Sequence, residues 1–146
     1  MKNIAFFLLP KAEVTYVYED STMRQVLDKM EFEKHPAIPI LNHEGKYVGT
    51  ITEGDLLWKV KNTPNLSFKN SRSVLLKHIE RRKTNQSVHI DADIDDLLTL
   101  AISQNFVPVV DDQDVFIGII RRKEIIEYCK KLVNNIRESE GKVDER

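Results

Sequence analysis

The sequence has little of what several functional classes require. Its 146 residues include one cysteine, Cys129, so an intramolecular disulfide framework is excluded and a reducing compartment such as the cytoplasm is favoured. Basic and acidic residues number 22 and 23, so no net charge attracts nucleic acid. No apolar run is long enough to cross a membrane, and the run at residues 4–9, which ends at Pro10, is too short for a secretory signal. We therefore expect a cytoplasmic protein with no membrane or nucleic-acid partner.

Side chains that could form a catalytic or metal site are scattered along the chain. No histidine is paired with another or with Cys129 at a metal-ligand spacing; the four are His35, His43, His78 and His89. Cys129 lies among apolar residues of one predicted helix, which is typical of a small core residue rather than a nucleophile. The chain also lacks a glycine-rich phosphate loop. These absences predict a protein that is not an enzyme and holds no metal.

An internal repeat is the most informative feature that is present. Pro39 and Pro108 are 69 residues apart, as are Gly49 and Gly118, and each pair stands in a similar apolar setting. Two similar units bury their apolar faces together. The sequence therefore predicts one body made of two halves.

Each half has the pattern of strand, helix, strand, strand and helix, an α/β arrangement. In the first half we expect strands at 14–18, 37–41 and 47–52, a helix that begins with a Thr22–Gln25 capping box and ends before Pro36, and a helix opening at Asp55. In the second half we expect strands at 87–90, 107–110 and 115–120 and helices at 94–101 and 124–136. The expected domains are an N-terminal packing helix (1–12), repeat one (13–61), a linker with a short helix (62–83), repeat two (84–136) and a charged tail (137–146).

The junction between strand and helix near residue 50 could bind a ligand. Gly49 allows close approach to the sheet, and the Thr52 hydroxyl stands where an anion would meet the next helix N-terminus. Asp55 follows three residues later and could accept hydrogen bonds from a ribose diol. The same spacing also forms a capping box, so a purely structural role is the alternative.

The repeat and the segment Gly-Thr-Ile-Thr-Glu-Gly-Asp at residues 49–55 resemble a tandem pair of cystathionine-β-synthase (CBS) domains. The resemblance covers residues 12–135 and implies two β-α-β-β-α units related by a pseudo-twofold axis, with two clefts between them. It further implies that these clefts bind AMP, ADP, ATP, S-adenosylmethionine or cyclic dinucleotides. The residues that it places at the cleft walls, in addition to Thr52 and Asp55, are Thr15, Tyr16, Ile38, Pro39, Ser87, Val107 and Pro108.

The second copy departs from the family pattern. Arg121 replaces the Thr or Ser, and Glu124 replaces the Asp. Arg121, Arg122 and Lys123 gather at a helix N-terminus, where the helix dipole disfavours cations, and a polyphosphate would satisfy them. Solvated basic runs are the alternative, here and at residues 81–83. The segment 116–122 also resembles CBS pairs that bind cyclic di-AMP.

We therefore expect a non-catalytic regulatory module that binds an adenine nucleotide between its repeats and signals to an unknown protein effector. It needs no cofactor beyond this regulatory ligand. The alternative is a structural or docking dimer with vestigial clefts. A homodimer is expected because the apolar stripe of the last helix, from Ile125 to Ile136, is longer than one small sheet can cover. The helix could instead fold back over residues 4–9.

Overall fold

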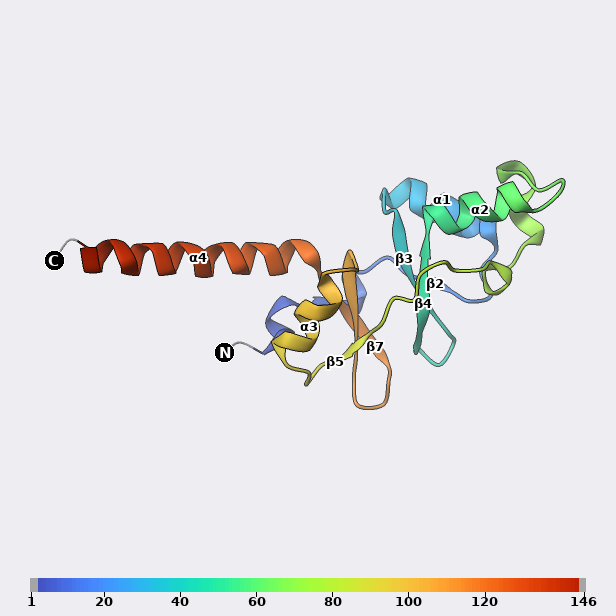
Figure 1. The fold of residues 1–146 in the computed structure, drawn as a ribbon. Coiled ribbons are helices and arrows are strands. Elements are labelled where there is room, and N and C mark those ends of the chain that lie inside the picture. The colour runs from blue at the N-terminus through green and yellow to red at the C-terminus, as the bar shows by residue number, and fades with distance from the viewer. Residues whose placement is uncertain (1–2, 145–146) are drawn as a thin grey trace.

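Two β-sheets, one for each repeat, lie side by side (Figure 1). They are seen in a computed structural model that describes residues 3–144. The first sheet has the strand order β2-β3-β4, and the second has the order β1-β7-β6-β5. The first repeat contains β2 (Val17–Tyr18), α1 (Met23–Glu33), β3 (Ala37–Leu41), β4 (Tyr47–Thr52) and α2 (Glu53–Asn62). The second contains β5 (Val88–His89), α3 (Ile94–Ala101), β6 (Phe106–Val110), β7 (Phe116–Arg121) and α4 (Arg122–Asp144).

This order confirms the two predicted β-α-β-β-α units. In each unit the first strand pairs in parallel with the second, and the second and third form an antiparallel hairpin. The first strands are shorter than predicted, two residues each rather than four or five. The capping box of α1 is confirmed: the Gln25 amide donates to Thr22 Oγ1 at 3.2 Å, and the Thr22 amide donates to Gln25 Oε1 at 2.9 Å.

The segments that precede the repeats differ from the predicted short helices. Residues 1–2 lie outside the described part of the chain, and the rest of the predicted N-terminal helix is η1 (Ile4–Phe7), β1 (Leu9–Pro10) and η2 (Lys11–Glu13). The linker contains two 3-10 helices, η3 (Phe68–Ser73) and η4 (Leu76–His78). Pro10 leaves no room for a continuous α-helix there, because a proline in a helix interior removes a backbone donor.

Each repeat is completed by the segment that precedes the other repeat. Ile4 and Phe7 are buried in the core of repeat two, and β1 pairs with β7 through Leu9 and Ile119. Leu76 and Ile79, from the linker before repeat two, are buried in the core of repeat one. A third cluster joins the two sheets; its buried members are Leu41, Phe106, Phe116 and Ile119. Each repeat therefore has its own core, and the third cluster packs the two sheets against each other.

At Gly118, strand β7 lies very close to the backbone of the N-terminal segment. A Cβ atom at Gly118 would lie 2.2 Å from the backbone oxygen of Leu9. At the equivalent Gly49, a Cβ atom would instead meet the flexible side chain of Arg81, at 2.8 Å from Nε. The pairing of β1 with β7 thus requires glycine at position 118.

Helix α4 corrects two predictions. It runs without a break to Asp144, so residues 137–144 of the predicted tail are helical. Its first turns pack on repeat two, where Ile125 is buried and the Tyr128 ring lies edge-on to Phe7 at 5.2 Å. Beyond Tyr128 it projects into solvent (Figure 1), and Cys129, predicted to be a core residue, is exposed. Helical spacing indicates which side chains share a face, but it does not show where the body beneath that face ends.

Candidate functional site

A cleft opens where the two repeats meet, and we call it the basic cleft. Its volume is about 290 Å³, near the lower end of the range of small-molecule pockets, about 300–1,000 Å³. Its apolar lining comes from both repeats: Leu9, Val14, Pro36, Ala37, Pro39, Phe106 and Ile119. Its polar lining is Glu13, Thr15, His35, Asn105, Arg121, Arg122 and Lys123. A flat apolar group would therefore be held between the repeats, with cations at one end.

The cationic end is formed by the last residue of β7 and the first turn of α4. Arg121 forms an ion pair with Glu124, in which Nε donates to Oε1 at 2.8 Å. Arg122 Nε donates to the carbonyl of Ala101 at 3.1 Å, while Lys123 is exposed. Three cations share this end with the N-terminus of α4, whose first amide, that of Arg122, donates to the carbonyl of Asn105 at 3.1 Å. Glu124 is paired with Arg121, and Glu13 also lines the cleft. An anionic group placed there would be stabilised by both the cations and the helix dipole.

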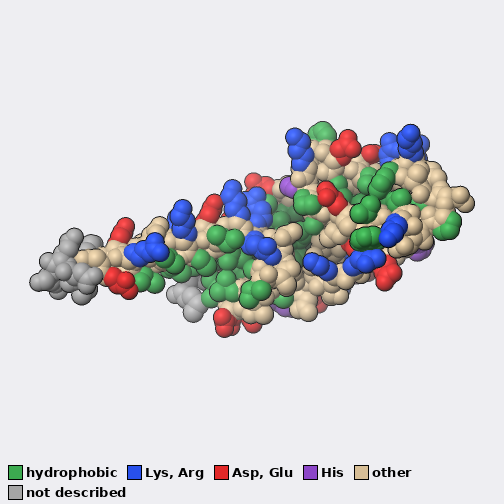
Figure 2. Space-filling model, turned by 45° about the horizontal axis from the view of Figure 1, so that its top comes forward, with side chains coloured by type: hydrophobic (Ala, Val, Ile, Leu, Met, Phe, Trp, Pro, Cys, Tyr) green, Lys and Arg blue, Asp and Glu red, His purple; other side chains and the backbone are tan. Residues whose placement is uncertain are grey.

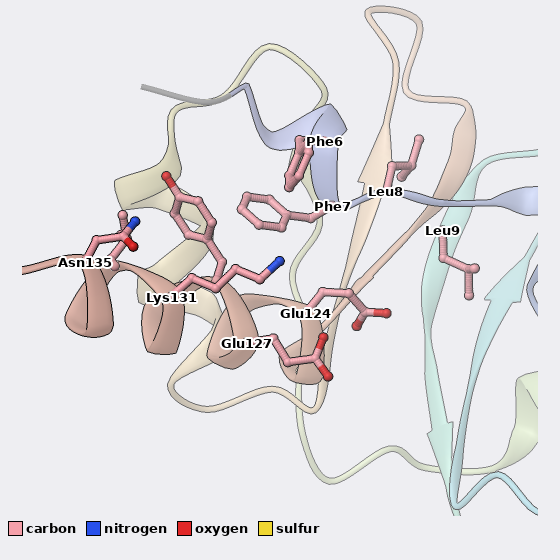
Figure 3. A pocket seen from close by; sticks show the side chains of 10 residues that line it. Phe6, Phe7, Leu8, Leu9, Glu124, Glu127, Lys131 and Asn135 are labelled. Atoms are coloured by element: carbon pink, nitrogen blue, oxygen red, sulfur yellow. The ribbon is translucent and has the colours of Figure 1, made fainter. Parts of the chain in front are cut away.

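Glu124 connects the basic cleft to a second hollow. That hollow, about 460 Å³ in volume, lies between residues 6–9 and α4, and Glu124 and Leu9 are among its lining residues (Figure 3). The Oε1 atom of Glu124 accepts from Arg121, whereas Oε2 is buried and has no hydrogen-bond partner among the described residues. Glu124 therefore retains an acceptor that a bound molecule or water could use.

The junction at Thr52 and Asp55 has a different structure. The Asp55 amide donates to Thr52 Oγ1 at 3.1 Å, and the Thr52 amide donates to Asp55 Oδ2 at 3.0 Å, which is the capping box that the spacing predicted. The remaining oxygen, Oδ1, accepts from the backbone amide of Arg82 at 3.0 Å. Asp55 is only 4% exposed. Both carboxylate oxygens are thus engaged by the protein itself.

Residues 85 and 86 are held by one polar side chain from each repeat, Tyr47 from the first and Gln104 from the second. The Tyr47 hydroxyl donates to the carbonyl of Asn85 at 2.8 Å and lies 2.7 Å from Thr50 Oγ1. Burial raises the pKa of Tyr47 to about 12, because ionisation would leave a charge in a poorly solvated site. Buried Gln104 accepts from the Gln86 amide at 2.8 Å and donates to the Gln86 carbonyl at 3.0 Å. These bonds hold the backbone at Asn85 and Gln86 between the two repeats.

The predicted site residues divide into groups. Thr15, Pro39, Arg121 and Arg122 come together in the basic cleft, with Glu124 bound to Arg121. The other predicted cleft residues lie elsewhere. Ile38 and Val107 are fully buried in the cores of their repeats, so only their backbone could line a cleft. Tyr16 packs against Tyr18 and Phe116. Ser87 is half-buried, and Pro108 is buried.

The sequence analysis missed several residues of the basic cleft. Ala37 and Phe106 occupy equivalent positions at the start of the middle strand of each repeat, and Ile119 faces them from β7. The repeat itself could have indicated the first two. Glu13 lies in the N-terminal segment, which packs on repeat two, and no local sequence pattern indicates that position. The second basic run lies apart from Arg121: Arg81 donates to the carbonyl of Val48, and the Arg82 guanidinium lies 4.8 Å from the centre of the Trp58 ring.

Within residues 3–144, no three His, Cys, Asp or Glu side chains are grouped closely enough to hold a metal ion. In that part of the chain, no helix is both long and apolar enough to cross a membrane.

Comparison with known proteins places both repeats. The family model of the CBS domain matches residues 8–62 and 77–131. The chain is 27% identical over 140 residues to the uncharacterized protein MJ1426 of Methanocaldococcus jannaschii, covering 76% of this chain and 83% of that one. A structure of CbpB in complex with c-di-AMP aligns with a TM-score of 0.79 at 20% identity, over 94% of this chain and 91% of the other. A structure of CBSX2 in complex with AMP aligns with a TM-score of 0.71 at 18% identity, over 90% and 98%.

Proposed function

This chain belongs to the CBS domain family, and we propose that it is a non-catalytic regulatory module that binds an adenine nucleotide in the basic cleft and signals to a partner protein. The observation that carries the proposal is the cleft itself, which has apolar walls from both repeats and three cations at one end. Two solved structures with the same fold contain an adenine nucleotide, c-di-AMP in CbpB and AMP in CBSX2, and this supports an adenine ligand.

The apolar walls and the cationic end of the cleft would contact different parts of the ligand. The base would lie between Ala37 and Pro39 of repeat one and Phe106 and Ile119 of repeat two. A phosphate would then meet the guanidinium of Arg121 at the N-terminus of α4, and charge-assisted hydrogen bonds of this kind are the strong ones. Because the ligand would contact both repeats, its binding would bias their relative position, and this is the change that a partner could sense.

The cationic end favours a ligand with more than one phosphate or with a phosphodiester. Arg121 stands where the first repeat has Thr52, and a guanidinium binds phosphate through two donors. Glu124 is already paired with Arg121, so it is less free than an unpaired carboxylate to bind a ribose diol. On this basis cyclic di-AMP or ATP would bind more tightly than AMP.

A thermal-shift panel tests the proposal. A ligand at 100 times its Kd stabilises the fold by about 2.7 kcal/mol, which should raise Tm by roughly 5–10 °C for a chain of this size. Adenine nucleotides and cyclic di-AMP should produce this shift, and their guanine analogues should not. Arg121→Ala should reduce the shift, and added salt should reduce it further. No shift with any adenine compound at millimolar concentration would refute the proposal.

The alternative, a docking protein with vestigial clefts, is favoured by one observation. The hydrogen bonds of Asp55 and Tyr47 already close the site at the first repeat. If this alternative holds, the basic cleft also binds no nucleotide, and the function of the chain is to associate with other proteins.

We further propose a homodimer. Large apolar side chains are exposed at equivalent places on both repeats: Phe32 and Ile102 at the ends of α1 and α3, and Leu57 and Ile126 on α2 and α4. A surface that repeats in this way suits a twofold interface. Size exclusion with light scattering should give twice the chain mass of 17.0 kDa, and a mass of one chain at micromolar concentration would exclude the dimer.

A further inference from the structure

An apolar groove on the first repeat and the projecting part of α4 are both exposed to solvent, and we infer that each fills the other in a second copy of the chain. We call residues 129–144 the arm. The inference rests on the proposed homodimer and specifies how the two copies meet. In the exchange, the arm of one copy lies in the groove of its partner, and the partner's arm lies in the groove of the first.

The groove lies between α1, α2 and the linker helix η3. Its volume is about 860 Å³, much larger than the basic cleft, and its apolar lining includes Leu27, Leu57 and Phe68. Leu57 is 51% exposed and Phe68 is 46% exposed, so the floor of the groove is open to solvent. Exposed apolar surface of this kind marks an interaction site.

The arm presents a matching surface. Every side chain from Cys129 to Gly141 is exposed. Leu132, Val133 and Ile136 nevertheless lie on one face of the helix and continue the stripe that starts at Ile126. Residues 129–144 span roughly 24 Å at 1.5 Å per residue. This length exceeds that of α1 or α2, so the arm could lie along the whole groove, as amphipathic helices do in apolar grooves.

Charge at the edges favours the same pairing. Lys130 and Arg137 flank the stripe on the side of Val133, because they follow Ile126 by four and eleven residues. On the rim of the groove, Arg24 forms an ion pair with Asp28. The other charged residues of the rim are two carboxylates, Glu31 and Glu53, and one cation, Lys69. A cationic edge of the arm would therefore meet a rim with an excess of carboxylates.

The arm cannot reach the groove of its own chain. Figure 1 shows α4 leaving repeat two on the side opposite to repeat one, where α1 and α2 lie. In Figure 2 the projecting helix carries hydrophobic side chains together with blue cationic and red acidic ones. Only a second copy can bring a groove to this arm, and a twofold axis then makes two equivalent contacts, which closes the assembly.

Cys129 on the arm allows a direct test by disulfide cross-linking. Leu57→Cys is combined with Cys129→Ser, and this variant is mixed with the wild-type chain under a mild oxidant. We expect a disulfide-linked pair whose tryptic peptides join position 57 of one chain to Cys129 of the other. As a matched control, Asp112→Cys with Cys129→Ser places a cysteine on the exposed β6–β7 hairpin and should give no such link. Absence of the link between position 57 and Cys129, or a dominant Cys129–Cys129 disulfide in the wild type, would overturn the inference.

A truncation separates this inference from the dimer itself. Ending the chain after Tyr128 removes the arm but keeps Ile125 and Tyr128, which pack on repeat two. We expect the truncated chain to be a monomer by light scattering, with an unchanged adenine-nucleotide thermal shift. A truncated chain that still dimerises would refute the arm exchange but keep the dimer. A monomeric full-length chain would refute both. As a second measure, Glu31→Lys should weaken dimerisation by roughly tenfold, and Lys130→Glu in the same chain should restore part of the loss.

Discussion

Replacing Asp55 with alanine would remove a carboxylate that accepts hydrogen bonds from two backbone amides. The carboxylate caps α2 through the Thr52 amide and holds the linker through the Arg82 amide. Loss of a helix N-terminal cap costs about 1 kcal/mol, and loss of a hydrogen bond to a charged group costs about 1.5–3 kcal/mol. We therefore expect Asp55→Ala to lower the free energy of unfolding by about 2–4 kcal/mol, or Tm by roughly 5–15 °C.

Asp93→Ala is the matched control. Asp93 caps α3 in the second repeat, where its Oδ1 accepts from the Asp96 amide at 2.9 Å. It is exposed, and within residues 3–144 its side chain makes no hydrogen bond to the linker. It should cost only about 1 kcal/mol. Urea unfolding of both variants at pH 7, followed by circular dichroism, gives the comparison. Equal losses for Asp55→Ala and Asp93→Ala would refute the argument that the Arg82 contact stabilises the fold.

The same variant also tests where the nucleotide binds. If the basic cleft is the site, Asp55→Ala should leave the affinity of the folded protein for adenine nucleotides unchanged, while Arg121→Ala should weaken it. Calorimetric titration at a temperature where both variants are folded measures this directly. A large loss of AMP affinity in Asp55→Ala alone would place the ligand at the first repeat instead.

Two other substitutions test the packing of the linker and the N-terminal segment. Gly118→Ala should lower the free energy of unfolding by about 1–3 kcal/mol more than Gly49→Ala does. Both glycines have a φ of 156°, but only at Gly118 would the added Cβ meet a backbone atom. Equal urea midpoints for the two variants would contradict this. Tyr47→Phe should cost about 1 kcal/mol at pH 7. Because the pKa of Tyr47 rises from 10.0 to about 12 on folding, the wild type should also lose stability as the pH rises from 10 towards 12, and the variant should lose less; parallel pH profiles of Tm would contradict this.

The sequence predicted the parts of the fold that local patterns determine. Apolar periodicity and turn chemistry located the hairpins and helices, and the repeat related Pro39 to Pro108. Local patterns could not show that the segment before each repeat packs on the other repeat. The burial of Ile4 and Leu76 depends on contacts with residues far along the chain. The same limit affects the candidate site. The spacing of Thr52 and Asp55 allowed both a cap and a ligand, and only the position of the Arg82 amide shows that the carboxylate is already engaged.

The crossed packing has a consequence for the order of folding during synthesis. The core of repeat one needs Leu76 and Ile79, which follow it in the chain, so repeat one can fold once the ribosome has released the linker. Strand β1 must wait for Gly118 and Ile119. At about 5–20 residues per second, this wait lasts roughly 5–20 s after residue 10 is made. During that interval Ile4 and Phe7 have no core to enter, so this segment becomes protected only after repeat two has been made.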